Sequence, residues 1–133
     1  MNAVYISIKP KYTKLIEAKE KNYEFRKYLI KDLKTMFVYE SETSCLKYIM
    51  EVDKPIVTPN QIDDEHYGND LFNKGDLYSY AYPIKHLYKL NKPITLTELK
   101  SKYGFTAPQK YTFSNKYPKL EKRLKEEKII QIF

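Results

Sequence analysis

The sequence predicts a mixed α+β fold built on a small mixed β-barrel, and three observations lead to this prediction. Strand-like segments follow one another at 35–40 and 45–52, with polar residues between them as in a hairpin turn. A long β-rich run at 78–90 contains Pro83, and a proline inside a strand marks an edge or a bulge, where a barrel bends. The helical segments are short and lie between or after the strands.

The elements of the N-terminal part follow from local patterns. Residues 1–8 alternate as a first strand. Residues 10–18 predict a short helix, because proline is favoured in a first turn and apolar residues recur at helical spacing. Residues 23–28 alternate again and predict a second strand.

The C-terminal half alternates turn-rich segments with short helices. The segment 55–75 is acidic and rich in turn residues, and we expect a short helix or a loop there that borders a site. Residues 95–98 form a capping-box pattern before a short helix that ends near Gly104. A basic helix is expected at 118–127, followed by a terminal strand at 129–133.

The size of the chain is that of one domain. With 133 residues, 42% of them hydrophobic, the chain can bury one core, and we expect a single domain over residues 1–133. The sequence has no apolar run near the length of a membrane span, and its first residues lack the apolar stretch of a signal peptide. We therefore expect a cytoplasmic protein that has no membrane partner; the sequence leaves its oligomeric state open.

The charge and the aromatic residues point to a partner that carries phosphates. Lys and Arg number 24 against 17 Asp and Glu, a formal net charge of +7. Tyr and Phe alternate with lysine at 9–12, 22–28 and 110–117. Because bases stack on aromatic faces while lysines neutralise phosphates, this mixture fits single-stranded or flipped-out nucleotides. The plain alternative is a lysine-rich surface that keeps the protein in solution, with tyrosines that pack in strands.

The densest group of functional side chains lies at the junction of the first helix and the second strand. In a strand every second side chain shares a face, so Glu24, Arg26 and Tyr28 are expected to point one way, and Tyr23, Phe25 and Lys27 the other. Lys21 precedes them in the turn. A carboxylate beside a guanidinium and a lysine can hold a polar ligand or take part in acid–base chemistry.

The same residues resemble the signature of the ASCH domains, which are members of the PUA-like superfamily. The signature is glycine, any, lysine, any, any, glutamate, any, arginine; Lys21, Glu24 and Arg26 match it, and Lys19 replaces the glycine. Further segments are similar in the family's order, at 6–12, 37–41, 92–94 and 107–111. The resemblance covers most of the chain except about 55–75, and it implies a PUA-like barrel of about six strands with short flanking helices. A left-handed lysine costs roughly 1 kcal/mol more than glycine, so the turn is expected to differ in shape.

The resemblance implies a domain that binds RNA, single-stranded or with a modified base, or a nucleoside, in RNA metabolism or transcription-coupled regulation. The expected binding residues are Lys9, Lys21, Glu24, Arg26, Lys27, Tyr39 and Ser41. Lys21 and Arg26 would hold a phosphate or the carbonyl edge of a base, and Glu24 would accept from an exocyclic amino group or orient Arg26. Tyr39 or Tyr23 would stack on the base.

A second hypothesis is an enzyme, either an amidohydrolase of the acetylcytidine type or a ribonuclease, with Lys21 and Glu24 as catalytic residues. Lys21 would have to lose its proton near neutral pH, and Glu24 opposes this unless Arg26 holds the carboxylate. The acetylcytidine relatives have a threonine where this chain has Glu24, so the lysine of their pattern is retained and the threonine is not.

The junction also admits an explanation without a ligand. Glu24 and Arg26 could form a plain surface ion pair, with Lys21 free in solvent. A third class of function, a protein-interaction module, is also open, and an exposed apolar patch in place of a basic cleft would favour it. His66 and His86 lie twenty residues apart without the spacing of metal ligands, and the sequence has no glycine-rich phosphate loop. We therefore expect no metal and no cofactor.

Overall fold

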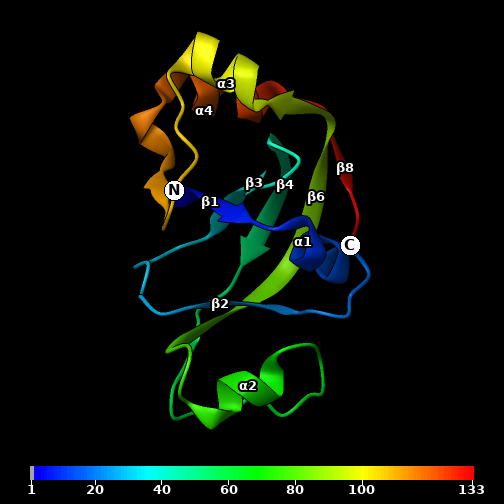
Figure 1. The fold of residues 1–133 in the computed structure, drawn as a ribbon, viewed down its shortest axis with the longest axis vertical. Helices are drawn as coiled ribbons and strands as arrows, with labels where there is room; N and C mark the ends of the chain where they lie inside the picture. Colours follow the sequence, from blue (N-terminus) through cyan, green and yellow to red (C-terminus); the bar gives the residue numbers. More distant parts are fainter. Residues whose placement is uncertain (1) are drawn as a thin grey trace.

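The computed structural model describes residues 2–133, and its strands form one curled sheet with short helices around it (Figure 1). In chain order the elements are β1 (Ala3–Ile8), α1 (Pro10–Glu17), β2 (Tyr23–Arg26), β3 (Thr35–Glu40), β4 (Cys45–Val52), β5 (Ile56–Val57), α2 (Asn69–Lys74), β6 (Tyr80–Thr95), α3 (Leu96–Tyr103), β7 (Thr112–Phe113), the 3-10 helix η1 (Ser114–Lys116), α4 (Pro118–Glu126) and β8 (Ile129–Gln131).

The main path of the sheet has six strands in the order β2-β6-β4-β3-β1-β7, and β5 and β8 pair with β6 outside this path. The β1–β3 pair is parallel and the β3–β4, β4–β6 and β2–β6 pairs are antiparallel, so the sheet is mixed. Within residues 2–133 the end strands β2 and β7 do not pair with each other. The fold is therefore a half-open, six-strand mixed barrel of the α+β class, as the sequence predicts.

The long strand β6 bends at Pro83 and joins the two ends of the molecule. Residues 80–83 pair with β2, and residues 84–95 pair with β4. The register against β4 shifts by one residue, because Glu51 pairs with His86 whereas the next residue, Val52, pairs with Ile84. This shift agrees with the predicted bulge. The strand is not an edge, however, and it continues to Thr95 rather than ending at Leu90, because β4 pairs with it as far as Cys45.

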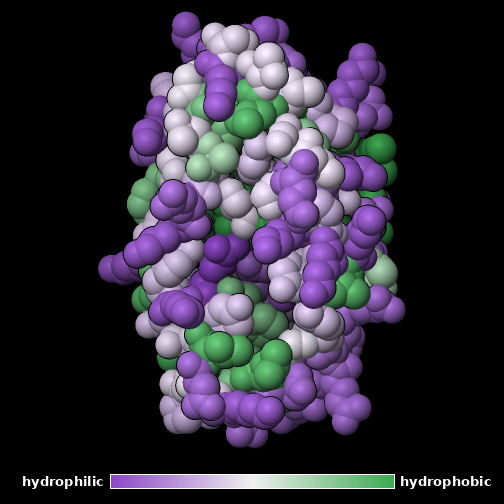
Figure 2. Space-filling view, in the orientation of Figure 1, coloured by the Kyte–Doolittle hydropathy of each residue, from purple (hydrophilic) through white to green (hydrophobic). Residues whose placement is uncertain are grey.

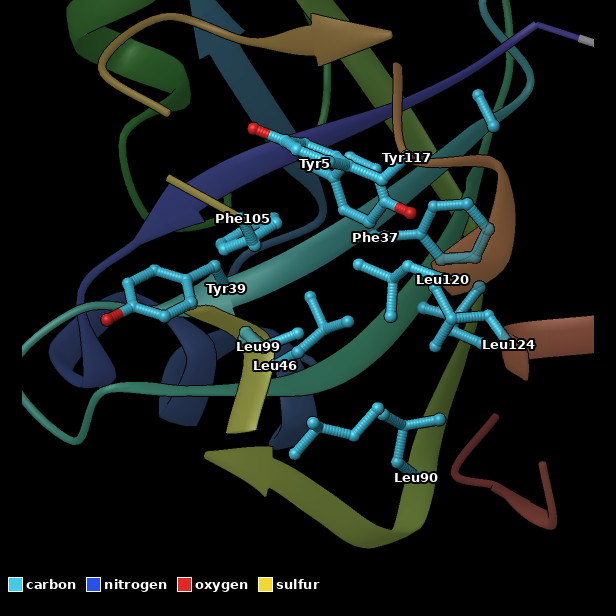
Figure 3. Packing of buried hydrophobic residues seen from close by; sticks show 13 residues of the cluster. Tyr5, Phe37, Tyr39, Leu46, Leu90, Leu99, Phe105, Tyr117, Leu120 and Leu124 are labelled. Carbon is cyan, nitrogen blue, oxygen red and sulfur yellow. The ribbon is translucent and has the colours of Figure 1, made fainter. Parts of the chain in front are cut away.

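Apolar side chains pack on both faces of the sheet because the residues of β1 alternate between two clusters. Ala3 and Tyr5 belong to the cluster that α3 and α4 cover (Figure 3), and Val4, Ile6 and Ile8 belong to the cluster beneath α1. A third, smaller cluster around Ile62, Phe72 and Ala81 holds α2 against β2 and β6. Burial on both faces explains why the central strands are apolar throughout.

Most predicted elements are present with ends shifted by one to three residues. The helices at 10–17, 96–103 and 118–126 match their patterns, and the hydroxyl of Thr95 accepts a hydrogen bond from the Glu98 amide at 3.2 Å, as a capping residue does. The first strand is described from Ala3, and Met1 lies outside the described residues. The segment 55–75 contains β5 and α2. No helix in residues 2–133 is long and apolar enough to cross a membrane.

Glu40, at the end of β3, is a buried carboxylate that ties α1 to the β3–β4 hairpin. It is 2% exposed and accepts hydrogen bonds from the hydroxyls of Thr13 on α1 at 2.5 Å and Thr43 at 2.7 Å. The ammonium of Lys47 lies 3.3 Å away. Burial alone would raise the pKa of Glu40, but the hydrogen bonds from Thr13 and Thr43 and the charge of Lys47 together hold this pKa below its usual value.

We expect Glu40→Gln to lower the free energy of unfolding by about 1–3 kcal/mol at neutral pH, because an amide cannot accept from all three donors. A depressed folded-state pKa means that this stabilisation is present above the unfolded-state pKa and is lost as pH falls through the folded-state pKa. Urea unfolding at neutral pH and at about pH 3 measures both effects. The difference from wild type should shrink in acid, and Glu42→Gln, in the exposed turn, should have little effect. A difference that is equal at both pH values would contradict this role.

Candidate functional site

The turn between α1 and β2 places the candidate site, and Lys19 gives it its shape. Lys19 has a left-handed backbone, with φ 61°, and the amides of Glu20 and Lys21 donate to the carbonyl of Leu15 at 2.8 and 3.1 Å. This is the conformation that glycine favours after a helix. Contrary to the expectation of a changed shape, Lys19 adopts it, and the backbone hydrogen bonds offset its cost of about 1 kcal/mol.

Lys21 is buried, with only 5% of its side chain exposed. Its Nζ donates to the carbonyl of Tyr23 at 2.5 Å, lies 4.2 Å from the ring centre of Phe25, and is 3.9 Å from Glu24 Oε1. Burial lowers the pKa of Lys21 below its usual value; the charge of Glu24 opposes this shift and the charge of Arg26 adds to it. Lys21 is thus closer to losing its proton than a surface lysine.

Glu24, which is buried, and Arg26, which is half-buried, form an ion pair. Arg26 Nε and Nη2 both donate to Glu24 Oε2, at 3.0 and 2.7 Å, and the side chains of Arg26 and Glu24 are 15% and 8% exposed. Arg26 also reaches the hydroxyl of Tyr28 at 3.3 Å and the carbonyl of Ser7 at 3.4 Å. Burial alone would lower the pKa of Arg26, but Glu24 and these hydrogen bonds raise it above its usual value, so Arg26 stays charged.

These contacts test two predictions about β2. Glu24, Arg26 and Tyr28 do share a face, as the alternation predicts. The hypothesis of a surface ion pair with Lys21 in solvent is wrong, because Lys21 and Glu24 are 5% and 6% exposed. Two donors on Oε2 leave Glu24 Oε1 free of Arg26, and the 3.9 Å between Oε1 and Lys21 is longer than a hydrogen bond.

Two adjoining cavities open above this ion pair. The first, here called the basic cavity, has a volume of about 590 Å³ and is lined by Ser7, Ile8, Lys9, Tyr12, Glu24, Phe25, Arg26, Lys27, Tyr28, Tyr78, Gln109 and Lys110. The second, here called the apolar cavity, has a volume of about 300 Å³ and is lined by Tyr12, Lys21, Glu24, Phe25, Tyr67, Gly68, Leu71, Leu77 and Tyr78. The shared lining residues make the two cavities one cleft.

The hydropathy of the surface around the cleft agrees with its division into a basic and an apolar cavity. Figure 2 shows a hollow with a hydrophilic floor in the region between β1 and β2, hydrophilic side chains around it, and a hydrophobic patch towards α2. The cations that line the basic cavity are Lys9, Arg26, Lys27 and Lys110, and its one carboxylate, Glu24, is paired with Arg26. The basic cavity therefore favours an anionic ligand.

The structure brings five of the expected site residues to the cleft and leaves two outside it. Lys9, Lys21, Glu24, Arg26 and Lys27 line the basic or the apolar cavity. Lys27 was expected on the opposite face from Arg26, but β2 ends at Arg26, so the alternation stops before Lys27.

Tyr39 and Ser41 do not line either cavity. Tyr39 is 4% exposed and packs in the core, with its ring 5.9 Å from that of Phe105, so no face of it is open to a base. Ser41 is half-buried beyond the end of β3, where its amide donates to the carbonyl of Ile8.

Several residues of the cleft were not singled out from the sequence. Ser7, Tyr12, Gln109 and Lys110 lie in segments that resemble the ASCH pattern, and this signal could have found them. Tyr67, Gly68 and Leu71 lie in the segment 55–75, which was expected to border a site although none of its residues was singled out. Leu77 and Tyr78 lie just beyond this segment, and nothing in the sequence marked them as site residues. Among residues 2–133 no three His, Cys, Asp or Glu side chains are grouped so as to hold a metal ion.

Comparison with solved structures identifies the fold. No protein-family model and no curated protein matches the sequence. The crystal structure of ASCH from Zymomonas mobilis is similar, with 19% identity and a TM-score of 0.66 over 95% of this chain and 96% of that chain. Two mutant forms of ZmASCH give 16% and 15% identity and TM-scores of 0.67 and 0.68, over 95% and 96% of this chain and 96% and 100% of theirs. The chain therefore has the ASCH, PUA-like fold, and at these identities the likeness shows the fold alone.

The position of Lys21 predicts an unusual titration. In NMR spectra of lysine-labelled protein, Lys21 should titrate at lower pH than the surface lysines, because burial disfavours its ammonium form. Glu24→Gln should lower the pKa of Lys21 further, since it removes the carboxylate and leaves the charge of Arg26 uncompensated. Glu126→Gln on α4 serves as the control and should leave Lys21 unchanged. A Lys21 signal that titrates with the surface lysines would contradict the burial argument.

Proposed function

We propose that this ASCH-fold protein binds a nucleotide in the cleft, either one residue of single-stranded RNA or a free nucleoside or its phosphate. The proposal rests on one observation: a half-buried guanidinium, fixed by a buried carboxylate, lines a cavity that three lysines also line. A fixed, paired Arg26 keeps its charge and loses little side-chain freedom when a ligand binds.

The basic cavity has groups for each part of a nucleotide. Lys9, Lys27 and Lys110 can neutralise a phosphate, and the ammonium of Lys110 lies 5.8 Å from the ring centre of Tyr28. Tyr12, Tyr28 and Tyr78 offer the aromatic surface that Tyr39 cannot. A volume of about 590 Å³ lies within the range of small-molecule sites.

Glu24 supplies a means of reading the base. Its Oε2 is occupied by Arg26, and its Oε1 can accept a hydrogen bond from the exocyclic amino group of adenine or cytosine.

The basic cleft favours ligand binding over a protein-interaction module, and a role in RNA metabolism or transcription-coupled regulation in the cytoplasm suits such a ligand.

We expect binding of a short single-stranded RNA to weaken with salt, by a slope of about −0.7 per neutralised phosphate in a plot of log affinity against log salt. The double variant Lys9→Ala/Lys110→Ala should weaken binding and make the slope less negative, because both ammonium groups line the basic cavity. Fluorescence anisotropy with a labelled oligonucleotide measures both. Lys119→Ala/Lys122→Ala, exposed on α4, is the matched control. Binding that is independent of salt, or lost equally in the control, would contradict the proposal.

A second candidate function is hydrolysis of an acylated base such as acetylcytidine, and the state of Lys21 favours it. The lowered pKa of Lys21 eases loss of its proton, and Arg26 holds Glu24, which is the condition under which Lys21 can act in catalysis. A neutral amine in the lining of the apolar cavity, beside Glu24, could act as a nucleophile or as a base.

The variant Lys21→Met should abolish release of acetate from acetylcytidine but keep the fold, because a flexible apolar side chain suits a position that is 5% exposed. Turnover by the wild type should rise with pH as Lys21 loses its proton. In Glu24→Gln the pH at which this rise is half complete should be lower, because the charge of Glu24, which raises the pKa of Lys21, is removed. Measurement of acetate against pH, with circular dichroism of each variant, tests this. Equal turnover in Lys21→Met would remove Lys21 from the chemistry.

A further inference from the structure

Three aromatic side chains lie in a row across the opening of the half-open barrel. The main path of the sheet ends in β2 on one side and in β7 on the other, and within residues 2–133 these two strands do not pair with each other. Tyr28 follows β2 and Tyr111 precedes β7, and their ring centres lie 5.3 Å apart. The ring of Tyr111 in turn meets that of Phe113 edge to face, at 5.5 Å. Tyr28, Tyr111 and Phe113 are here called the aromatic row.

The aromatic row begins in the basic cavity and ends in solvent. Tyr28 lines that cavity, whereas Tyr111 and Phe113 line neither cavity of the cleft. Phe113 is 47% exposed, yet its position is fixed, because its backbone pairs with Val4 of β1 and its ring contacts Tyr111. The row therefore leads from the cleft to an aromatic ring that the fold holds in place but does not cover.

The chain segment that carries the outer part of the row is basic. Residues 107–118 include Lys110 and Lys116, both exposed, and no Asp or Glu. These two lysines stand before and after the aromatic residues of the segment. A carboxylate from α4, Glu121, accepts from the hydroxyl of Ser114 in this segment, but Ser114 is only 3% exposed, so this bond lies beneath the surface.

Aromatic rings between exposed ammonium groups suit one kind of ligand in particular. Single-stranded nucleic acid offers unpaired bases that stack on aromatic faces and phosphates that lysines neutralise, at regular intervals along one chain. A free nucleotide would fill the basic cavity and leave Phe113 and Lys116 without a role.

We propose that the aromatic row is a second binding site, which takes the nucleotides next to the one in the cleft. The ligand is then a single strand of RNA several nucleotides long rather than a free nucleoside or nucleotide. A base stacks on Phe113, and Lys110 and Lys116 neutralise phosphates on either side of it. This inference rests on the proposed binding of a nucleotide in the cleft.

Isothermal titration calorimetry tests this with CMP and AMP and with the tetranucleotides of cytidylate and adenylate. At least one tetranucleotide should bind the wild type about fivefold or more tighter than it binds Phe113→Ser, since this is the lower limit for a base that loses an aromatic partner. CMP and AMP should bind both proteins equally, because Phe113 lines neither cavity. Both proteins carry the same charge, so the difference reports stacking and not electrostatic attraction.

Two further variants separate stacking from a change in the fold. Phe113→Tyr keeps an aromatic ring and should bind the tetranucleotide as the wild type does. Ile130→Ser removes an apolar side chain that is 50% exposed on β8 and lies outside both cavities, and it should have no effect on either kind of ligand.

Tetranucleotide binding that Phe113→Ser leaves unchanged would overturn this inference, and so would an equal loss for mononucleotide and tetranucleotide. The proposed function would still stand in either case, because a nucleotide would still bind in the cleft. Failure of every mononucleotide and tetranucleotide to bind the wild type would overturn both.

Discussion

The ion pair between Glu24 and Arg26 is the interaction on which the rest of the cleft depends. Through Arg26 it connects β2 to Tyr28 and to the carbonyl of Ser7 on β1, a strand with which β2 does not pair. Because Glu24 Oε2 accepts both hydrogen bonds from Arg26, only Oε1 of Glu24 is left to accept a hydrogen bond from a ligand. A largely buried pair of this kind contributes little net stability, because desolvation of both charges opposes their attraction. Its value lies in fixing a cation and an acceptor at known positions.

The sheet supplies the space for that pair. Because β6 leaves β4 near Pro83 and pairs with β2 instead, β2 lies apart from β1, and the basic cavity forms between them. The connection from β5 to β6 then folds back as α2 and closes the far side with apolar residues. One bend in one strand therefore produces a cleft whose two ends differ in polarity.

The sequence was sufficient to predict contacts in the candidate site between residues that are close to one another in the chain. Lys21, Glu24 and Arg26 are five residues apart at most, so strand alternation predicts which of them meet. Tyr39 was expected in the site as an aromatic residue of a segment that resembles the family, and this resemblance carries no information on burial; every residue of β3 is buried, Tyr39 included. Lys110 and Tyr78 are far from β2 in the sequence, so no local pattern predicts that they line the same cavity; the resemblance of segment 107–111 points to Lys110, and nothing points to Tyr78.

The burial of Lys21 is difficult to explain by stability alone, and this favours a functional role for the residue. Its ammonium has one carbonyl acceptor at hydrogen-bond distance and a carboxylate that is already shared with Arg26, so the fold compensates its desolvation poorly. An apolar side chain of the same length would fill the space at lower cost. A side chain that stability disfavours, placed in the lining of the apolar cavity, is a candidate for contact with the ligand that we propose for the cleft.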